Sequence, residues 1–157
     1  MKKTNAARQL DQMGFPYRLV DYPFDEKDLG AASVAEKIGI PLDRVFKTLV
    51  VRGDKTGVFL AVVPGDDELD LKAVAALTGN KKCELVHLKE VLPLTGYQRG
   101  GVSPLGSRKA FPVVIDESAL RFGEISVSAG LRGLQMLLDP AQLVLAARAK
   151  TGNIVRD

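Results

Sequence analysis

The sequence feature that most constrains the fold is a pair of β-branched segments, VFKTLVV at 45–51 and VFLAVV at 58–63. Val-rich runs of this length favour β-strands, because branched side chains pack well on a pleated surface. The segment that joins them, RGDKTG, is polar and contains glycine, as turns between paired strands usually do. We therefore predict that these two segments form a hairpin.

Helix start and stop residues predict five helices in addition to this hairpin. Thr4, Asp70 and Asp139 can cap helices through their side-chain oxygens, and Ser33 with Glu36 has the spacing of a capping box. Glycines that follow the apolar runs supply the stops. The predicted helices lie between Thr4 and Gly14, over 34–38 up to Gly39, over 71–77 up to Gly79, over 88–92, and from Pro140 to Gly152.

Further strands are predicted from apolar runs at 17–22, 83–86, 111–115, 124–127 and 134–138. Strands outnumber helices, and the two do not alternate strictly, which argues against a doubly wound parallel sheet. The chain has 157 residues, 46% of them apolar and 26% charged, which is usual for one globular domain. We therefore expect a single α+β domain over 1–157, with a mixed sheet flanked by helices.

Cysteine and histidine occur once each, as Cys83 and His87. One cysteine cannot form an internal disulfide, and these two residues cannot complete a structural zinc site. The sequence contains no G-x-S-x-G motif, no apolar run of about 18 residues, and an amphipathic segment at 1–14 where a signal peptide would be apolar. We therefore expect a cytoplasmic protein with no metal, no cofactor, no membrane partner and no conventional protein nucleophile.

Lys47 is the only charged residue in the first segment of the hairpin. In a strand its side chain shares a face with Val45 and Leu49, while Phe46 and Thr48 occupy the other face. An ammonium in such apolar surroundings must be paired, lose its proton or line a cavity, which makes Lys47 a candidate site residue. The alternative is a lysine on an edge strand, which guards against aggregation or extends its head to water.

A glycine-rich segment at 95–109, TGYQRGGVSPLGSRK, is the second candidate. Gly100 and Gly101 let the main chain approach a ligand closely, and consecutive N–H groups can bind a phosphate or an oxyanion. The alternative is a turn-rich connection, because the spacing matches neither a GxGxxG nor a Walker motif. The whole stretch 91–115 lacks acidic residues, which suits a phosphate-bearing ligand, although the net charge of +3 does not require one. Its basic residues are Arg99, Arg108 and Lys109.

A third segment, ISVSAGLRG at 125–133, places Ser128 beside Gly130. The Ser128 hydroxyl could donate to a ligand oxygen, or it could cap its own turn. The same two kinds of interpretation apply to Tyr22, where the first predicted strand ends before a proline. The acidic run at 65–70 lacks EF-hand spacing and is interpreted as a turn followed by a helix cap.

Taken together, VFKTLVV, TGYQRGGVSPLG and VSAGLRG resemble the YbaK/ProX family of aminoacyl-tRNA editing deacylases, which is similar to the editing domain of bacterial prolyl-tRNA synthetases. The resemblance implies a mainly antiparallel curved sheet. Within the family the chain is most similar to the YbaK branch, which removes cysteine from mischarged Cys-tRNA(Pro), rather than to the branch that removes alanine. Mischarged tRNA is thus the expected partner, with prolyl-tRNA synthetase as a second candidate partner.

The resemblance also implies the site residues. Lys47 matches the essential lysine of the family, Gly100 and Gly101 its active-site glycine loop, Ser128 a pocket serine and Tyr22 a pocket tyrosine. The same motifs place Ser103 and Gly130 among the expected substrate-binding residues.

The mechanism implied for the YbaK branch needs no nucleophile from the protein. The thiol of the substrate attacks its own ester carbonyl, which expels the tRNA and leaves a cyclic thioester for water to open. We expect the protein to hold this geometry, with Lys47 orienting the aminoacyl group and the Gly100 and Gly101 amides binding the oxygen. Serine is excluded because a hydroxyl ionises far less readily than a thiol, and alanine has no nucleophile.

Three other functions remain open at this point. The chain could deacylate another small amino acid such as alanine, or could be a non-catalytic module that binds tRNA or a synthetase. It could also be a small-molecule or nucleotide-binding α+β domain that uses the glycine-rich segment for phosphate.

Overall fold

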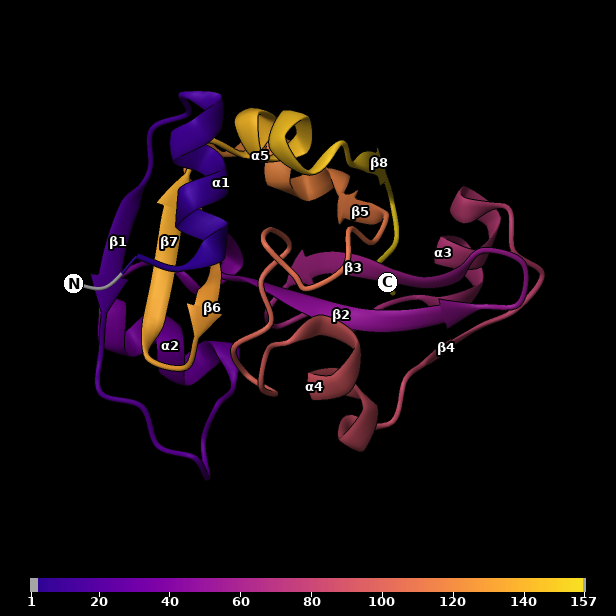
Figure 1. The fold of residues 1–157 in the computed structure, drawn as a ribbon, viewed down its shortest axis with the longest axis horizontal. Helices are drawn as coiled ribbons and strands as arrows, with labels where there is room; N and C mark the ends of the chain where they lie inside the picture. The colour runs from indigo at the N-terminus through magenta and orange to yellow at the C-terminus, as the bar shows by residue number, and fades with distance from the viewer. Residues whose placement is uncertain (1–2, 157) are drawn as a thin grey trace.

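The computed structural model describes residues 3–156, which form two β-sheets and five α-helices (Figure 1). The larger sheet has the strand order β4-β2-β3-β5-β8 and the smaller one the order β1-β7-β6. Four of the six strand pairs are antiparallel, and the pairs β3-β5 and β5-β8 are parallel. The α+β class and the mixed, mainly antiparallel pairing are therefore confirmed, but the strands are divided between two sheets instead of forming one.

The predicted hairpin is confirmed and forms the centre of the larger sheet. Strands β2 (Phe46–Gly53) and β3 (Gly57–Pro64) are paired over their whole length, in a register that places Leu49 opposite Ala61. Strand β3 also pairs with β5 (Val113–Asp116), which in turn pairs with β8 (Lys150–Gly152).

The other edge of β2 has two partners, one near each end of the strand, and together they leave its middle unpaired within residues 3–156. Strand β4 (Cys83–Leu85) pairs only with Val51–Gly53, and the Val86 N–H donates to the Val50 carbonyl. At the opposite end, Val45 forms an isolated parallel bridge to Ser126, which links the two sheets. The edge of β2 between these contacts is open.

The smaller sheet consists of β1 (Arg18–Asp21), β7 (Leu134–Leu138) and β6 (Ile125–Leu131). Strand β7 lies at the predicted residues, and β6 starts one residue later than predicted and extends four residues further. The register of β6 against β7 shifts between Ser128 and Leu131. Ser126 of β6 bridges to Val45, next to the start of β2. The register shift, which begins two residues later at Ser128, therefore lies near the open edge of β2.

The predicted caps start and end two helices as expected. Thr4 accepts a hydrogen bond from the Ala7 N–H at the start of α1 (Asn5–Met13), and Gly14 ends this helix with φ +75°. Asp70 caps α3 (Leu71–Thr78), and Gly79 ends it. Helix α4 (Leu88–Thr95) runs three residues beyond its predicted end and includes Pro93.

Two predicted helix boundaries were wrong, the start of α2 and the end of α5. Helix α2 (Ala31–Ile38) starts after Gly30, so Ser33 lies inside its first turn, because Ala31 and Ala32 extend the helix backwards. Helix α5 (Pro140–Ala147) starts at the predicted cap but ends at Arg148, which adopts φ 51°, and not at Gly152. The residues after Arg148 form β8 by pairing with β5, and local helix propensity does not predict such a long-range contact.

The apolar pattern of the hairpin buries both of its faces. Phe46, Val50 and Leu60 face a large core that also contains residues of α1, β6, β7 and α5, while Val51 and Phe59 face a smaller cluster that contains α3. Figure 1 shows α1, α5 and the smaller sheet grouped at one end of the molecule and α3 near the tip of the hairpin. Two short 3-10 helices, Leu42–Arg44 and Glu117–Arg121, complete the fold. Among residues 3–156 no helix is long and apolar enough to cross a membrane.

Candidate active site

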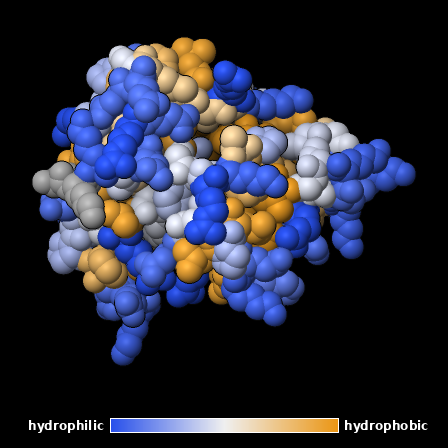
Figure 2. Space-filling model, viewed as in Figure 1, coloured by the Kyte–Doolittle hydropathy of each residue, from blue (hydrophilic) through white to orange (hydrophobic). Residues whose placement is uncertain are grey.

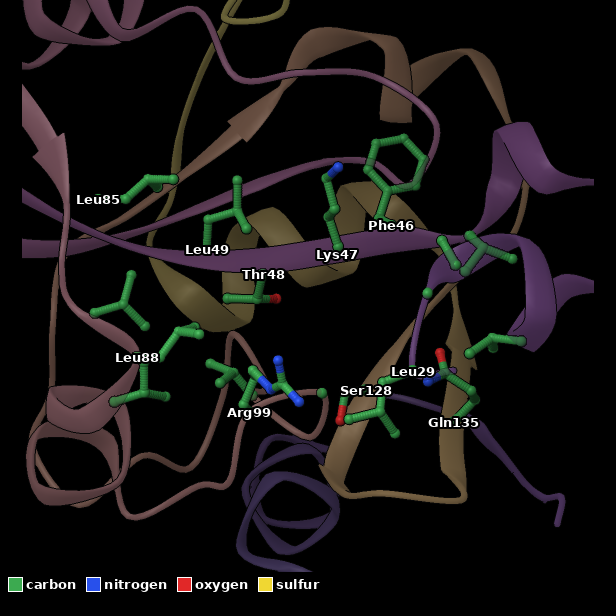
Figure 3. Close-up of a pocket in the computed structure, with 18 of the residues that line it drawn as sticks. Leu29, Phe46, Lys47, Thr48, Leu49, Leu85, Leu88, Arg99, Ser128 and Gln135 are labelled. Carbon is green, nitrogen blue, oxygen red and sulfur yellow. The ribbon is translucent and has the colours of Figure 1, made fainter. Parts of the chain in front are cut away.

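A cavity of about 420 Å³ lies at the open edge of β2 (Figure 3). It is bounded by β2 itself, by the loop before α2, by the start of α4, and by residues of the glycine-rich segment and the smaller sheet. Its volume falls within the range of small-molecule sites. Its lining combines apolar side chains with charged and polar groups, and includes Glu26, Lys27, Leu29, Lys47, Thr48, Leu85, Leu88, Arg99, Gly100, Ser128 and Gln135.

Lys47 lies on the part of β2 that has no partner strand on the cavity side. Its side chain is half-buried, and Nζ donates a hydrogen bond to the carbonyl oxygen of Gly65 at 3.2 Å. In Figure 3, Lys47 and Leu49 project from one side of the strand and Thr48 from the other, toward Arg99 and Ser128. Lys47 therefore lines a cavity, as the first interpretation expects, whereas β2 lies between β4 and β3 in the sheet and is not an edge strand as the alternative requires.

The glycine-rich segment is a closed loop with its own internal hydrogen bonds. The Arg108 N–H donates to the Thr95 carbonyl at 2.9 Å and joins the two ends of the loop, as in an Ω-loop. Across its middle, the buried Tyr97 hydroxyl donates to the Leu105 carbonyl at 2.7 Å. Burial raises the pKa of Tyr97 to about 12, which keeps this hydroxyl protonated as a donor. The loop 96–107 is therefore held in one shape.

Gly100 and Gly101 have different surroundings, although they are adjacent. Gly100 lines the cavity with φ +83°, and a Cβ there would meet the side chain of Leu29 at 2.9 Å. The Gly101 N–H donates to the Gln98 carbonyl at 2.9 Å, so it is already occupied. A Cβ on Gly101 would lie 3.1 Å from the Arg132 backbone nitrogen. The expected pair of amide donors is thus reduced to Gly100, while Gly101 packs the loop against the β6–β7 turn.

Ser128 lines the cavity and also takes part in a turn. Its hydroxyl oxygen accepts a hydrogen bond from the Gly130 N–H at 3.1 Å, so the turn interpretation is correct. A hydroxyl that accepts one bond still has its O–H to donate. Both sequence interpretations of Ser128 are therefore compatible.

Three other expected residues lie behind the cavity wall. The Ser103 hydroxyl is fully buried and accepts a hydrogen bond from the Leu105 N–H at 3.3 Å. Gly130 packs against the ring of Tyr97, which a Cβ would approach to 2.9 Å. Tyr22 packs against a small apolar cluster formed around α2, and its N–H donates to the Gly133 carbonyl. None of the three is among the residues that line the cavity.

Sequence reasoning overlooked Thr48 and Gln135. The Thr48 hydroxyl oxygen is buried, and within residues 3–156 it has no hydrogen-bond partner. The Gln135 amide oxygen accepts a hydrogen bond from the Ser126 hydroxyl at 2.7 Å, between β6 and β7. Thr48 could have been predicted as a candidate, because it is a polar residue inside the β-branched run VFKTLVV.

The charges of the cavity are mainly positive. Lys27, Lys47 and Arg99 line it together with one carboxylate, Glu26, which is exposed and lies 4.0 Å from the guanidinium of Arg132. Cys83 and His87 do not line it, and burial raises the pKa of the Cys83 thiol. In the part of the chain that the structure describes, no three His, Cys, Asp or Glu residues form a group that could hold a metal ion. Such a site can bind a ligand that carries negative charge and can polarise a carbonyl group.

Residues 27–145 match the family model described as the aminoacyl-tRNA editing domain, and the chain therefore belongs to this family. The matched range includes the cavity residues from Lys27 to Gln135.

Three relatives place the chain within this family. It is 48% identical over 143 residues to a protein of Enterococcus faecalis named "Putative Cys-tRNA(Pro)/Cys-tRNA(Cys) deacylase EbsC", with 91% of this chain and 87% of that one covered. It is 33% identical over 76 residues to the proline–tRNA ligase of Thermosipho africanus, which covers 48% of this chain and 13% of the ligase. A solved structure described as "a putative trans-editing enzyme for prolyl tRNA synthetase" superposes with a TM-score of 0.86 at 27% identity, covering 100% of both chains.

Proposed function

We propose that the protein is a trans-acting aminoacyl-tRNA deacylase that removes cysteine from mischarged Cys-tRNA(Pro). The observation that carries this proposal is a cavity that combines cations and hydroxyl groups but contains neither the cysteine nor the histidine of the chain. Membership of the editing-domain family supports an aminoacyl ester as the substrate. The name of the Enterococcus faecalis relative supports cysteine as the amino acid.

The nucleophile in this proposal is the cysteine side chain of the substrate. Its sulfur attacks the ester carbonyl carbon, the bond from that carbon to the terminal ribose oxygen breaks, and the thiol proton ends on the departing ribose hydroxyl. The product is a strained cyclic thioester, which water opens to free cysteine. Holding sulfur and carbonyl in contact supplies a large effective concentration, so positioning alone accelerates the first step strongly.

Three cavity residues contact the substrate in this step. The Gly100 N–H binds the carbonyl oxygen, on which negative charge develops, and the Lys47 ammonium orients the aminoacyl group electrostatically. Ser128 donates its O–H to the aminoacyl group. Gly101, Ser103, Gly130 and Tyr22 act as positioning residues, because they hold the loop, the β6–β7 turn and the α2 region behind the wall.

The partner in this proposal is the 3′-aminoacyl end of tRNA, with the synthetase that charges tRNA(Pro) as a second partner. We place the reaction in the cytoplasm, where mischarged tRNA is made. The whole activity is assigned to residues 1–157 acting as a single domain.

The test is release of labelled amino acid from tRNA(Pro) charged with cysteine, alanine or serine. We expect rapid release of cysteine and release of the other two at the uncatalysed rate. Alanine released as fast as cysteine would overturn the substrate-thiol mechanism and favour an alanine deacylase. Binding of free nucleotide without release of any amino acid would favour a nucleotide-binding domain.

A substrate analogue separates the nucleophiles more sharply. Cysteine with a methylated thiol is larger by one methyl group, and it has no thiol proton and no thiolate that could act as the nucleophile. We expect tRNA(Pro) carrying S-methylcysteine to bind and to resist cleavage. Cleavage at the cysteine rate would show that water or a protein group attacks directly.

A further inference from the structure

A second hollow, of about 730 Å³, lies on the other side of α4 from the cavity and is called the basic groove below. It contains two cations, Arg108 and Lys109, and no acidic residue. Its walls come from the turn of the hairpin, the end of α4 and the segment before β5. The acid-free stretch 91–115 is therefore divided between two places, with Arg99 in the cavity and the other two cations here.

One loop joins the two places. Its far part, at Arg99 and Gly100, lines the cavity, and its closed base, where the Arg108 N–H bonds the Thr95 carbonyl, lies at the basic groove. Helix α4 joins them as well, because Leu88 and Val91 line the cavity while Pro93 and Leu94 line the groove. Eight residues of helix span about 12 Å. A ligand longer than this can occupy both sites.

The carboxylates near the groove already have partners. Glu90 of α4 pairs with Arg52 at 3.1 Å. Asp54, in the turn between β2 and β3, accepts hydrogen bonds from the Lys81 and Lys82 N–H groups at 2.9 and 3.0 Å. The exposed side chain of Lys55 in the same turn adds a further positive charge. The Arg52–Glu90 pair is neutral overall and Lys55 offsets the charge of Asp54, so Arg108 and Lys109 leave this part of the surface with a positive balance.

Arg108 and Lys109 differ in what else they do. The side chain of Arg108 lies across the end of α4, 3.5 Å from where a Cβ of Gly96 would be, and there it offsets the negative end of the helix dipole. The exposed Lys109 side chain makes no hydrogen bond or ion pair within residues 3–156. Among the residues that the structure describes, the Lys109 ammonium is thus available to a ligand.

Figure 2 shows hydrophobic surface near the middle of the displayed face, bordered by hydrophilic residues, where the segment between α4 and β5 crosses the hairpin. The groove residues of this segment include the half-buried Phe111 and the exposed Pro112. Because Phe111 packs against the larger core, the groove offers a nucleic acid two cations for its phosphates beside an apolar wall.

We propose that the basic groove binds the sugar–phosphate backbone of the tRNA acceptor end while the 3′-terminal aminoacyl group occupies the cavity. This inference rests on the proposed deacylase function and adds the surface that holds the rest of the substrate. Arg108 and Lys109 pair with phosphates, and α4 separates them from the reacting ester. The groove contributes affinity for the nucleic acid and has no part in the chemical step.

The test compares the double variant Arg108→Ala/Lys109→Ala on two substrates, full-length Cys-tRNA(Pro) and a cysteinyl ester of adenosine that lacks the acceptor end. We expect kcat/KM on the tRNA to fall about tenfold through KM, and kcat/KM on the small ester to stay unchanged. The slope of log Kd for uncharged tRNA(Pro) against log salt concentration is expected to decrease by about 2, one for each lost phosphate contact. The matched control Arg8→Ala/Lys72→Ala removes the same charge from α1 and α3, outside both hollows, and should change neither value.

The outcomes separate this inference from the proposed function. If the unaltered protein cleaves neither substrate, the deacylase function fails, and with it the basis of the inference. If it cleaves both, but the double variant keeps the normal KM and salt slope on tRNA, the groove does not bind phosphates. If the double variant binds tRNA normally and loses binding to prolyl-tRNA synthetase, the groove is a protein-docking surface and the inference is overturned. The single variant Lys109→Ala guards against a folding defect, because Lys109 has no partner to lose.

Discussion

The ammonium of Lys47 is held by the backbone carbonyl of Gly65, 3.2 Å away, at the point where the chain leaves β3. No side chain fits at Gly65, because a Cβ there would lie 2.1 Å from the Cβ of Ala31 in α2. The acceptor is a neutral carbonyl and not a carboxylate, although the Lys47 charge also acts on the nearby Asp67 carboxyl, whose pKa burial raises and Lys47 lowers in part. The packing of α2 against Gly65 thus sets the position of the charge beside the cavity.

Replacement of Lys47 by alanine is predicted to abolish cysteine release and to leave the fold intact. Loss of the charge that orients the aminoacyl group misplaces the reacting atoms and lowers kcat by about 100-fold or more. The side chain is half-buried and makes one hydrogen bond, so the free energy of unfolding should change by about 1 kcal/mol or less. Single-turnover release of labelled cysteine measures the first quantity and urea unfolding the second. Lys72→Ala on the exposed face of α3 is the control, and full activity of Lys47→Ala would remove this lysine from the mechanism.

Gly101→Ala is predicted to slow turnover more than it lowers stability. The new Cβ would lie 3.1 Å from the Arg132 nitrogen and 3.3 Å from the Leu131 carbonyl carbon, so the loop must move away from the β6–β7 turn. A contact this short requires a shift of a few tenths of an ångström, which also moves the adjacent Gly100. Because misplacement by about 1 Å can cost about 100-fold in rate, we expect this smaller shift to cost about tenfold. We expect a loss of about 1–2 kcal/mol in unfolding free energy from the crowding.

The matched control for this glycine is Gly123→Ala, where a Cβ would meet nothing within 4 Å. Stability there should stay the same or rise slightly, and activity should be unchanged. Equal fractional losses of folded protein and of activity in Gly101→Ala would mean that the loop is a plain connection.

Thr48→Val is predicted to weaken catalysis without weakening the fold. The buried Thr48 hydroxyl oxygen has no partner within residues 3–156, and replacing an unsatisfied hydroxyl by a methyl group is neutral or stabilising by up to about 1 kcal/mol. If the substrate supplies the missing partner, kcat/KM falls about fivefold. Thr78→Val is the contrasting variant, because the Thr78 hydroxyl donates to the Val74 carbonyl at 2.7 Å and lies outside the cavity. Unchanged kinetics in Thr48→Val would show that the substrate does not contact this hydroxyl.

The elements that could be predicted from the sequence are those determined by local patterns. The hairpin followed from β-branched runs on either side of a polar turn, and α3 followed from Asp70 and Gly79. Strand β8 could not be predicted, because Lys150–Gly152 becomes a strand only by pairing with β5, more than thirty residues earlier in the chain. The division into two sheets depends on long-range pairing in the same way.

The candidate site was predictable at the level of segments more than of atoms. Lys47, Gly100 and Ser128 are brought to one cavity, as their motifs suggested. The Gly101 N–H donates to the Gln98 carbonyl, and the Tyr22 N–H donates to the Gly133 carbonyl. No sequence pattern predicts these two hydrogen bonds, so the positions of both residues outside the set of ligand donors could not be predicted. The sequence showed that the stretch 91–115 is basic. Only the structure shows that α4 separates Arg99, in the cavity, from Arg108 and Lys109 in the basic groove.

Tyr97→Phe is predicted to destabilise the protein at neutral pH and to change how stability depends on pH. The variant removes the O–H that donates to the buried Leu105 carbonyl, which costs about 1–2 kcal/mol. Burial raises the pKa of Tyr97 to about 12, whereas tyrosine in the unfolded chain loses its proton near pH 10. Between these values the unfolded chain is stabilised by ionising and the folded protein is not, so the contribution of Tyr97 is fully present below about pH 10 and is lost as the pH rises toward 12.

The linked loss amounts to about 2–3 kcal/mol over this interval. The difference in unfolding free energy between the unaltered protein and Tyr97→Phe should therefore shrink from pH 10 to pH 12, because phenylalanine cannot ionise. Urea unfolding at pH 7, 10 and 11.5 measures it. Two curves that stay parallel above pH 10 would mean that Tyr97 ionises equally readily in the folded protein, and that the loop 96–107 opens to water without global unfolding. In that case the positions of Gly100 and Arg99 beside the cavity would not be maintained by the Tyr97–Leu105 hydrogen bond.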